Sequence, residues 1–132
     1  FGNRRRMLVS PQHGLIFQTA GEQHLIRAKH AAEALGGKFA RIDKHCERVT
    51  YIHIMFDQHQ LVFAEGGPSE SFYPGPVALN SLDRDALTEL LFLYPELARV
   101  TNGDTPARMG YGDPVRPYLR RKDVLSAVRE AA

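Results

Sequence analysis

Four side chains in this sequence are the strongest candidates for a site: Ser10, His13, His53 and His59. Serine and histidine can act as nucleophile, hydrogen-bond donor, general acid or general base. Ser10 and His13 lie three residues apart, between two apolar runs in the stretch LVSPQHGLIF. The proline after Ser10 cannot donate to a β-ladder, and the glycine after His13 tolerates a positive φ. The backbone around His13 should therefore leave regular pairing, which allows its imidazole to point inward.

His53 and His59 flank an Asp-Gln pair that can form a turn. Residues 48–56 alternate as an almost doubly apolar strand, and residues 59–64 alternate as a second one. We therefore predict a hairpin over 48–65 that carries the two histidines on opposite arms, where both can face one cavity. The alternative for each histidine is a plain hydrogen bond at a half-buried sheet face.

The remaining histidines and the cysteine make weaker candidates for chemistry. His24 and His30 lie six residues apart, which places them on different faces of a helix rather than side by side as metal ligands. The adjacent pair His45 and Cys46 diverges in an extended loop, and no second pair at zinc-ligand spacing lies nearby. Cys46 is the single cysteine, so no internal disulfide can form. We expect no metal site and no cofactor.

The composition suits one globular domain. The chain has 132 residues, 43% of them hydrophobic, which is enough for a single core. Its 17 Lys plus Arg against 15 Asp plus Glu give a net charge of +2, unlike the basic surface of a nucleic-acid-binding domain. No apolar run approaches the roughly 18 to 20 residues of a membrane span or follows the N-terminal arginines as a signal-peptide core. We expect neither a nucleic-acid nor a membrane partner.

The first part of the chain reads mainly as strands. Residues 8–17 are expected to form strand, turn and strand around His13. Residues 22–37 begin with a short apolar run and continue as a helix that two glycines stop. Short strands are also expected over 39–42 and 69–73.

The second part of the chain reads as helices and turns. Asp83 can cap a helix, the stretch 101–117 is rich in turn residues, and residues 119–132 form a terminal helix. The sequence thus predicts a mainly β domain over 1–77 and a small helical C-terminal extension over 78–132 that packs on it.

With these residues in view, the chain resembles the second half of a bacterial Hint domain, the Hedgehog/intein autoprocessing fold. The segments that carry the resemblance are LVSPQHGLIF, HLIRAKHAA and VTYIHIMFDQHQLVFAEGGPSESFYPG, over about Met7 to Gly75. They are similar to a subgroup with SPQH, an AKH segment, a Y-x-H strand, H-x-x-V-x-A-E-G and E-S-F-x-P-G. The later runs PELA and RPYLRR also resemble this subgroup. The resemblance implies a Hint-type β-fold that is incomplete at its N-terminal side.

The resemblance also implies a self-acting rearrangement of a peptide bond. In the family, a Cys or Ser at the start of the domain attacks the preceding carbonyl, and a second nucleophile resolves the resulting thioester or ester. Ser10 and His13 sit at the place of the Thr-x-x-His motif, which makes His13 the general acid and Ser10 a hydrogen-bond donor to the scissile group. His59 resembles the histidine that assists the second step, and His53 lies near the place of an aspartate in that motif.

Departures from the family pattern shape the expected outcome. No cysteine precedes Ser10, so we expect the nucleophile upstream of Phe1, in a missing half-domain and its flanking segment. This upstream polypeptide is then the main partner, and the isolated chain is expected to be inactive although the full precursor is autocatalytic. The terminus His-Asn followed by Cys, Ser or Thr is also absent. Cleavage or thioester transfer is therefore favoured over protein splicing.

Exposed sheet edges of a half-domain would also favour self-association. The resemblance leaves the location open between the bacterial cytoplasm and secretion as part of a larger protein. Two other functional classes stay open as well. One is an inactive β-rich interaction domain that binds a protein partner. The other is a hydrolase that pairs Ser10 or Ser69 with His13 or His59, although no third member or oxyanion loop is identifiable.

Overall fold

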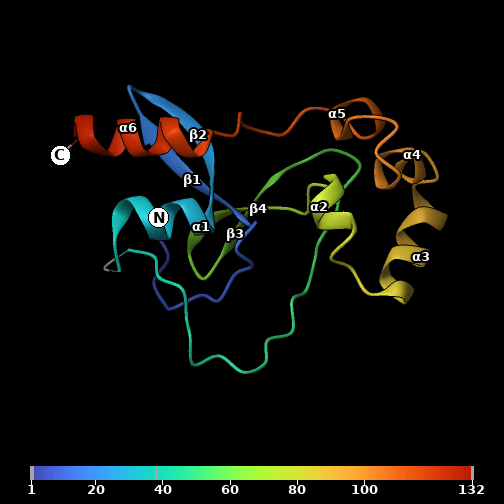
Figure 1. Cartoon of the computed structure of the whole chain (residues 1–132), viewed down its shortest axis with the longest axis horizontal. Coiled ribbons are helices and arrows are strands. Elements are labelled where there is room, and N and C mark those ends of the chain that lie inside the picture. The colour runs from blue at the N-terminus through green and yellow to red at the C-terminus, as the bar shows by residue number, and fades with distance from the viewer. Residues whose placement is uncertain (1, 38, 132) are drawn as a thin grey trace. The chain divides into compact units, whose positions relative to one another are not determined.

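The chain forms one antiparallel sheet and several helices, as the computed structural model in Figure 1 shows; the structure describes residues 2–37 and 39–131. Two strands and a helix come first, followed by two more strands and then five helices, within this described part. Contacts between residues divide the chain into two compact units. Unit 1 comprises Phe1–His53, Leu61–Glu70 and Arg116–Ala132, and unit 2 comprises Ile54–Gln60 and Ser71–Val115.

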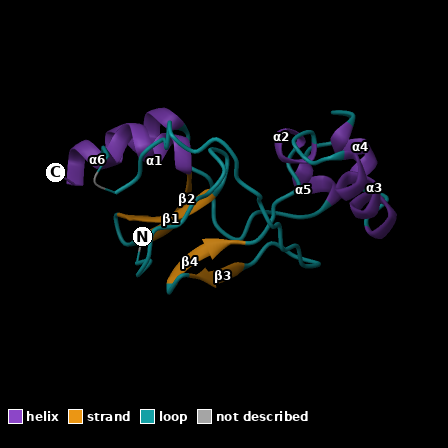
Figure 2. Ribbon diagram, turned by 90° about the horizontal axis from the view of Figure 1, so that it is seen from below, coloured by secondary structure: helices purple, strands orange, loops and turns teal. Residues whose placement is uncertain are grey.

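The sheet belongs to unit 1 and consists of two hairpins (Figure 2). Its strands are β1 (Gly14–Thr19), β2 (Glu22–Arg27), β3 (Leu61–Ala64) and β4 (Gly67–Glu70). β1 pairs antiparallel with β2, and β3 pairs antiparallel with β4. The antiparallel pair of Leu15 with Ser69 joins β1 to β4, so the strand order is β2-β1-β4-β3.

Two-residue turns close both hairpins. Ala20 and Gly21 have φ values of 49° and 82°, and Glu65 and Gly66 have φ values of 52° and 82°. A positive φ at both central residues is the geometry of the type I′ turn, whose twist matches that of the flanking strands. Glycine adopts this conformation without strain at the second position, and the tight turn fixes the strand register.

Two helices complete the core of unit 1. They are α1 (Ala28–Leu35) and α6 (Arg121–Ala131), which pack against each other (Figure 1). Ala31 of α1 and Val124 of α6 are buried together with Leu15 and Ile26 of the sheet. α1 ends at Gly36, whose φ of 71° lies in the region that favours glycine. The predicted glycine stop of this helix is confirmed, and so is the terminal helix.

Unit 2 is helical. Its helices are α2 (Pro76–Leu79), α3 (Arg84–Leu93), α4 (Leu97–Thr101) and α5 (Ala107–Gly110). They surround a second core, in which Leu79, Leu97 and Val100 are fully buried. Asp83 precedes α3, and its side chain accepts a hydrogen bond from the Ala86 N–H at 2.8 Å. This is the N-cap that the sequence predicts.

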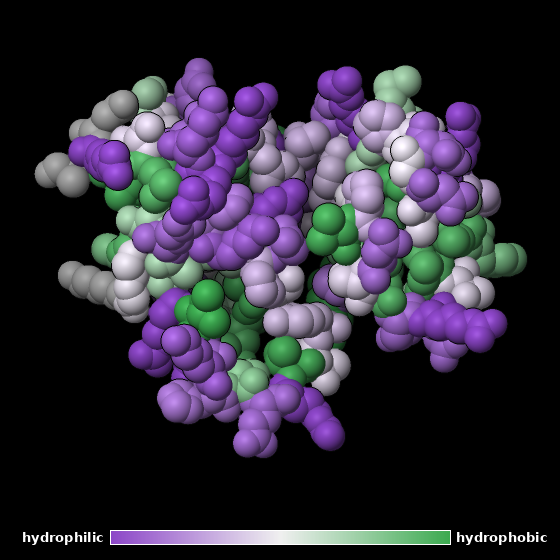
Figure 3. Space-filling view, viewed as in Figure 1, coloured by the Kyte–Doolittle hydropathy of each residue, from purple (hydrophilic) through white to green (hydrophobic). Residues whose placement is uncertain are grey.

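The predicted hairpin over 48–65 is wrong. Residues 48–56 form no strand, and Ile52 within them is 86% exposed. The hairpin that forms is β3 with β4, because its turn combines two positive φ values and contains a glycine, which the Asp-Gln turn lacks. The alternation of apolar residues over 48–56 is typical of a strand, but none of these residues belongs to a strand of the sheet. Figure 3 shows apolar side chains among polar ones at the surface.

Other strand predictions also need correction. Residues 8–9 and 39–42 are irregular, and the strand expected over 69–73 is β4, which ends at Glu70. Helices outnumber strands in the described chain, so the mainly β fold is not confirmed. The division into 1–77 and 78–132 stays a prediction. None of the helices described has the length and apolarity that a membrane crossing requires.

Candidate functional site

Ser10 and His13 lie in one tight turn directly before β1. The Ser10 carbonyl accepts a hydrogen bond from the His13 N–H at 3.0 Å, and Ser10 Oγ accepts one from the Gln12 N–H at 3.1 Å. Pro11 sits inside the turn, where its missing N–H leaves no donor without a partner. The Ser10 side chain therefore stabilises the turn that presents His13.

The same turn caps α1. Its Pro11 and His13 carbonyls accept hydrogen bonds from the N–H groups of Lys29 and Ala28, at 3.0 and 2.8 Å. These donors belong to the first turn of the helix, where backbone N–H groups have no partner within the helix. α1 has no side-chain cap of its own, so the turn and the helix fix each other.

His13 reaches across to the second hairpin. Its Nε2 is hydrogen-bonded to Ser69 Oγ of β4 at 2.7 Å, and Ser69 is only 3% exposed. A hydroxyl group can donate to a bare ring nitrogen or accept from a protonated one. Ser69 can therefore keep the His13 imidazole in place in either charge state.

His59 lies in unit 2 and is 4% exposed. Its Nδ1 accepts a hydrogen bond from the Val115 N–H at 3.0 Å. The ring proton must then sit on Nε2, which donates to the Ser71 carbonyl at 3.1 Å. Backbone groups thus fix the tautomer of His59, and its ring lies 5.0 Å from that of Tyr73, centroid to centroid.

His53 lies in the irregular segment of unit 1. Its ring centroid is 6.5 Å from that of Tyr51, and partial burial of the imidazole lowers the pKa of His53. The residue as a whole is exposed. The structure therefore brings Ser10 and His13 together in a turn. The hairpin arm expected to carry His53 does not form, and the other arm forms only as β3, which begins after His59.

Two residues that the sequence left unnoticed hold this turn as well. The Glu70 carboxylate accepts hydrogen bonds from the Gly14 N–H and from the Tyr118 hydroxyl. Glu70 lies in the E-S-F motif, but nothing local in the sequence signals that it reaches Gly14, 56 positions earlier. Such long-range pairings depend on the sheet register.

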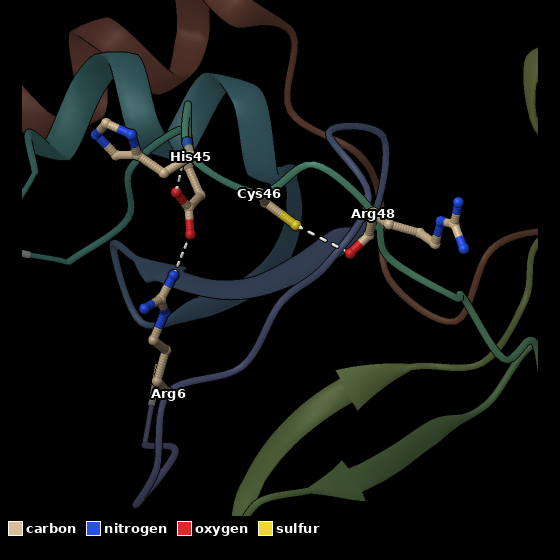
Figure 4. A network of polar contacts seen from close by, with 5 residues as sticks. Arg6, His45, Cys46 and Arg48 are labelled. Atoms are coloured by element: carbon tan, nitrogen blue, oxygen red, sulfur yellow. Dashed lines mark hydrogen bonds and ion pairs between the residues drawn. The ribbon is translucent and has the colours of Figure 1, made fainter.

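A cavity of about 600 Å³ lies in unit 1, lined by the N-terminal segment, α1 and residues 39–51. At its wall Arg6 forms an ion pair with Asp43, and Cys46 Sγ donates to the Arg48 carbonyl at 3.4 Å (Figure 4). The His45 N–H, with help from Arg6, lowers the pKa of Asp43. No group of three His, Cys, Asp or Glu side chains suited to a metal ion occurs among the residues described.

Comparison with known proteins gives one family. The sequence model of the Hint domain matches residues 1–76, more than half of the chain, and this match includes all four candidate side chains. No curated protein and no solved structure matches the chain. The chain belongs to the Hint domain family.

Proposed function

We propose that this chain is part of a Hedgehog/intein-type autoprocessing module, which rearranges and cleaves a peptide bond of its own polypeptide. Membership of the Hint domain family supports this function. The observation that carries it is the His13 imidazole, presented by the Ser10 turn and held at Nε2 by the buried Ser69 hydroxyl at 2.7 Å. This arrangement suits a histidine that must change its charge without losing its place.

The first step is an acyl shift to a nucleophile outside residues 1–132. A Cys thiol or Ser hydroxyl loses its proton to solvent and attacks the preceding carbonyl carbon. A C–S or C–O bond forms, and the C–N bond breaks. An amide is stabilised by resonance and its amine is a poor leaving group, so the departing nitrogen needs a proton. His13 supplies it as general acid, which contributes on the order of 10²- to 10⁴-fold to the rate.

Ser10 has a smaller part in this step. Its Oγ accepts the Gln12 N–H and keeps its own hydrogen, which can be donated to the scissile group. Because a neutral donor of this kind can be replaced by water, we expect Ser10 to matter less than His13.

His59 is the candidate for the second step, and His53 for orienting or packing. In the described conformation, backbone groups bond both ring nitrogens of His59. A catalytic role for His59 therefore requires that either the Val115 N–H or the Ser71 carbonyl is released. In the described conformation, His59 links the segments of unit 2 that contain Ser71 and Val115.

The finer parts of the proposal concern subgroup, partner and outcome. The SPQH and E-S-F-x-P-G motifs favour the bacterial subgroup and the second half of its Hint domain. The partner is then the polypeptide segment that supplies the nucleophile and the other half of the fold. Near the place of the family's His-Asn motif this sequence has Glu70, Ser71 and Phe72, so cleavage or thioester transfer is the favoured outcome rather than splicing.

Hydroxylamine tests the proposed function on the longer polypeptide that contains this chain. It should attack the thioester or ester and release an upstream fragment ending in a hydroxamate, which intact-mass measurement identifies. Replacing the upstream nucleophile by Ala is the matched control and should abolish the adduct. An uncleaved polypeptide in hydroxylamine would favour the alternative, an inactive interaction domain that binds a protein partner.

The Ser69 contact with His13 also has the pairing of a hydrolase nucleophile and its base. Ser69 is 3% exposed, however, so a substrate carbonyl has little access to its hydroxyl. An ester hydrolysis assay on the isolated chain separates the two functions, since turnover that is lost in Ser69→Ala would support the hydrolase.

A further inference from the structure

The segment around Tyr118 lies outside the family match but packs in unit 1 beside β2. The Leu25 N–H donates to the Pro117 carbonyl at 2.9 Å, and the Leu119 N–H donates to the Leu25 carbonyl at 2.9 Å. Leu25 and Tyr118 thus form a parallel β-bridge, and Leu25 is fully buried. The backbone on both sides of Tyr118 is fixed to the sheet.

The Tyr118 side chain reaches the His13 turn by two routes. Its hydroxyl donates to the Glu70 carboxylate, which also accepts the Gly14 N–H. The Arg27 guanidinium lies over the Tyr118 ring, with its Cζ atom 4.8 Å from the ring centroid. The same guanidinium donates to the Gln12 carbonyl at 3.0 Å. Both routes end on residues adjacent to His13 in the sequence.

Gly14 is built for the first of these routes. A Cβ atom at this position would lie 2.6 Å from Glu70 Cδ, closer than real Cβ contacts come. A side chain at position 14 would therefore require the Glu70 carboxylate to shift from its present place. Ser69 bonds the His13 ring, and the next residue, Glu70, bonds the Gly14 N–H. Two successive residues of β4 therefore hold the turn.

We propose that Tyr118 is a positioning residue for His13, acting through Glu70, so that the C-terminal segment 116–132 belongs to the working unit of this Hint domain. The catalytic consequence rests on the proposed function. The positioning itself rests on the hydrogen bonds from Tyr118 to Glu70 and from Gly14 to Glu70. Removing the Tyr118 hydroxyl loosens the carboxylate, and the His13 turn loses a fixed neighbour.

The test compares Tyr118→Phe with Tyr73→Phe in the isolated chain. Tyr73 is the matched control because its hydroxyl also donates one hydrogen bond, to the Gly112 carbonyl at 2.9 Å, but in unit 2. NMR should show that Tyr118→Phe shifts the Gly14 amide and the His13 ring nitrogens and speeds Gly14 amide exchange on the order of tenfold. Tyr73→Phe should leave these signals unchanged. Equal signals in the two variants would overturn the proposal.

Variants at Glu70 separate positioning from general destabilisation. Glu70→Gln should stay close to wild type, because the amide oxygen can accept the Gly14 N–H while its NH₂ donates to the Tyr118 oxygen. Glu70→Leu removes both acceptors and should reproduce the Tyr118→Phe spectrum. If Glu70→Gln shifts the Gly14 amide and His13 ring signals as far as Glu70→Leu does, the bridging role of Glu70 is wrong.

The catalytic consequence is measured in the longer polypeptide with hydroxylamine. Tyr118→Phe should slow cleavage on the order of tenfold, whereas the single variant Glu70→Gln should keep most of the wild-type rate. A wild-type rate in Tyr118→Phe would contradict the positioning role. A precursor that never cleaves would instead remove the proposed function, while the NMR result on the isolated chain would still decide whether Tyr118 positions His13.

Discussion

His13 and His59 are the same residue type in similar apolar sequence, yet their two units hold them differently. In unit 1 the His13 ring meets a side-chain hydroxyl, which can donate or accept. In unit 2 the His59 ring is fixed between a backbone N–H and a backbone carbonyl, which cannot exchange roles. The comparison teaches that the hydrogen-bond partners of an imidazole bear on whether it can change its charge without breaking a contact.

The largest effect is expected from removing the His59 ring. His59→Ala removes the hydrogen bonds of the ring with the Val115 N–H and the Ser71 carbonyl and opens a cavity beside Tyr73. The free energy of unfolding of unit 2 should therefore fall by about 2–4 kcal/mol. Urea unfolding measures this change, and amide exchange at Val115 places it in unit 2. His45→Ala, at an exposed histidine, is the control and should change stability by less than about 0.5 kcal/mol. Similar small losses in both variants would remove the structural role of His59.

Removing the His13 ring should cost less stability. His13→Ala deprives the buried Ser69 hydroxyl of its partner, which lowers the free energy of unfolding of unit 1 by about 1–2 kcal/mol. The double variant with Ser69→Ala should recover part of this loss, because no buried hydroxyl then lacks a partner. A double variant that loses the sum of both single changes would show that the two side chains do not interact.

The pH dependence of unit 1 should show a third histidine, His30 of α1. Burial lowers the pKa of His30 below its ordinary value of 6.5, and the positive charges of Lys29, Arg27 and Arg121 lower it further. The carboxylate of Glu33 has the opposite, smaller effect. Just below pH 6.5, His30 therefore binds a proton in the unfolded chain but stays neutral in the folded chain. Stability should fall as the pH drops below 6.5 and level off below the folded pKa.

The control for this pH effect is His30→Gln, measured by urea unfolding across the same range. The variant should flatten the part of the profile just below pH 6.5. His53, whose pKa is lowered by partial burial, contributes in the same direction and should account for the slope that is left. An unchanged profile in His30→Gln would show that His30 is as easily protonated in the folded chain as in the unfolded one.

The smallest effect is expected at the exposed ion pair of Arg121 with Glu33, which joins α6 to α1. The pair lowers the pKa of Glu33 and raises that of Arg121, but solvent and salt screen it. Arg121→Gln should leave the unfolding midpoint nearly unchanged at physiological salt. Val124→Ala, in the fully buried contact of the same helix, should lower stability by about 1–3 kcal/mol. A larger loss in Arg121→Gln than in Val124→Ala would reverse this account of the helix contact.

Local signals in the sequence predicted local structure well. Gly36 ends α1 and Asp83 caps α3, since a positive φ and an N-cap each depend on one residue and its near neighbours. The turn at Ser10 and His13 follows for the same reason from the proline and glycine within and after it. These features were open to prediction because no distant partner decides them.

Long-range partners decided the rest. Residues 48–56 alternate like a strand, but alternation does not reveal whether a ladder partner is available, and Ile52 remains exposed. Likewise the contact of His13 with Ser69 joins positions 56 apart and depends on the register of β1 against β4. Sequence reasoning found His13 as a candidate, but the hydroxyl group that holds its ring comes from β4 of the sheet.

The proposed role of His13 as general acid is tested most directly by hydroxylamine cleavage of a polypeptide that includes the proposed upstream nucleophile and carries His13→Gln, alongside His45→Gln as control. We expect His13→Gln to slow cleavage on the order of 10²- to 10⁴-fold while urea unfolding shows unit 1 still folded, and His45→Gln to cleave at the wild-type rate. A folded His13→Gln variant that cleaves as fast as wild type would contradict the assignment of His13.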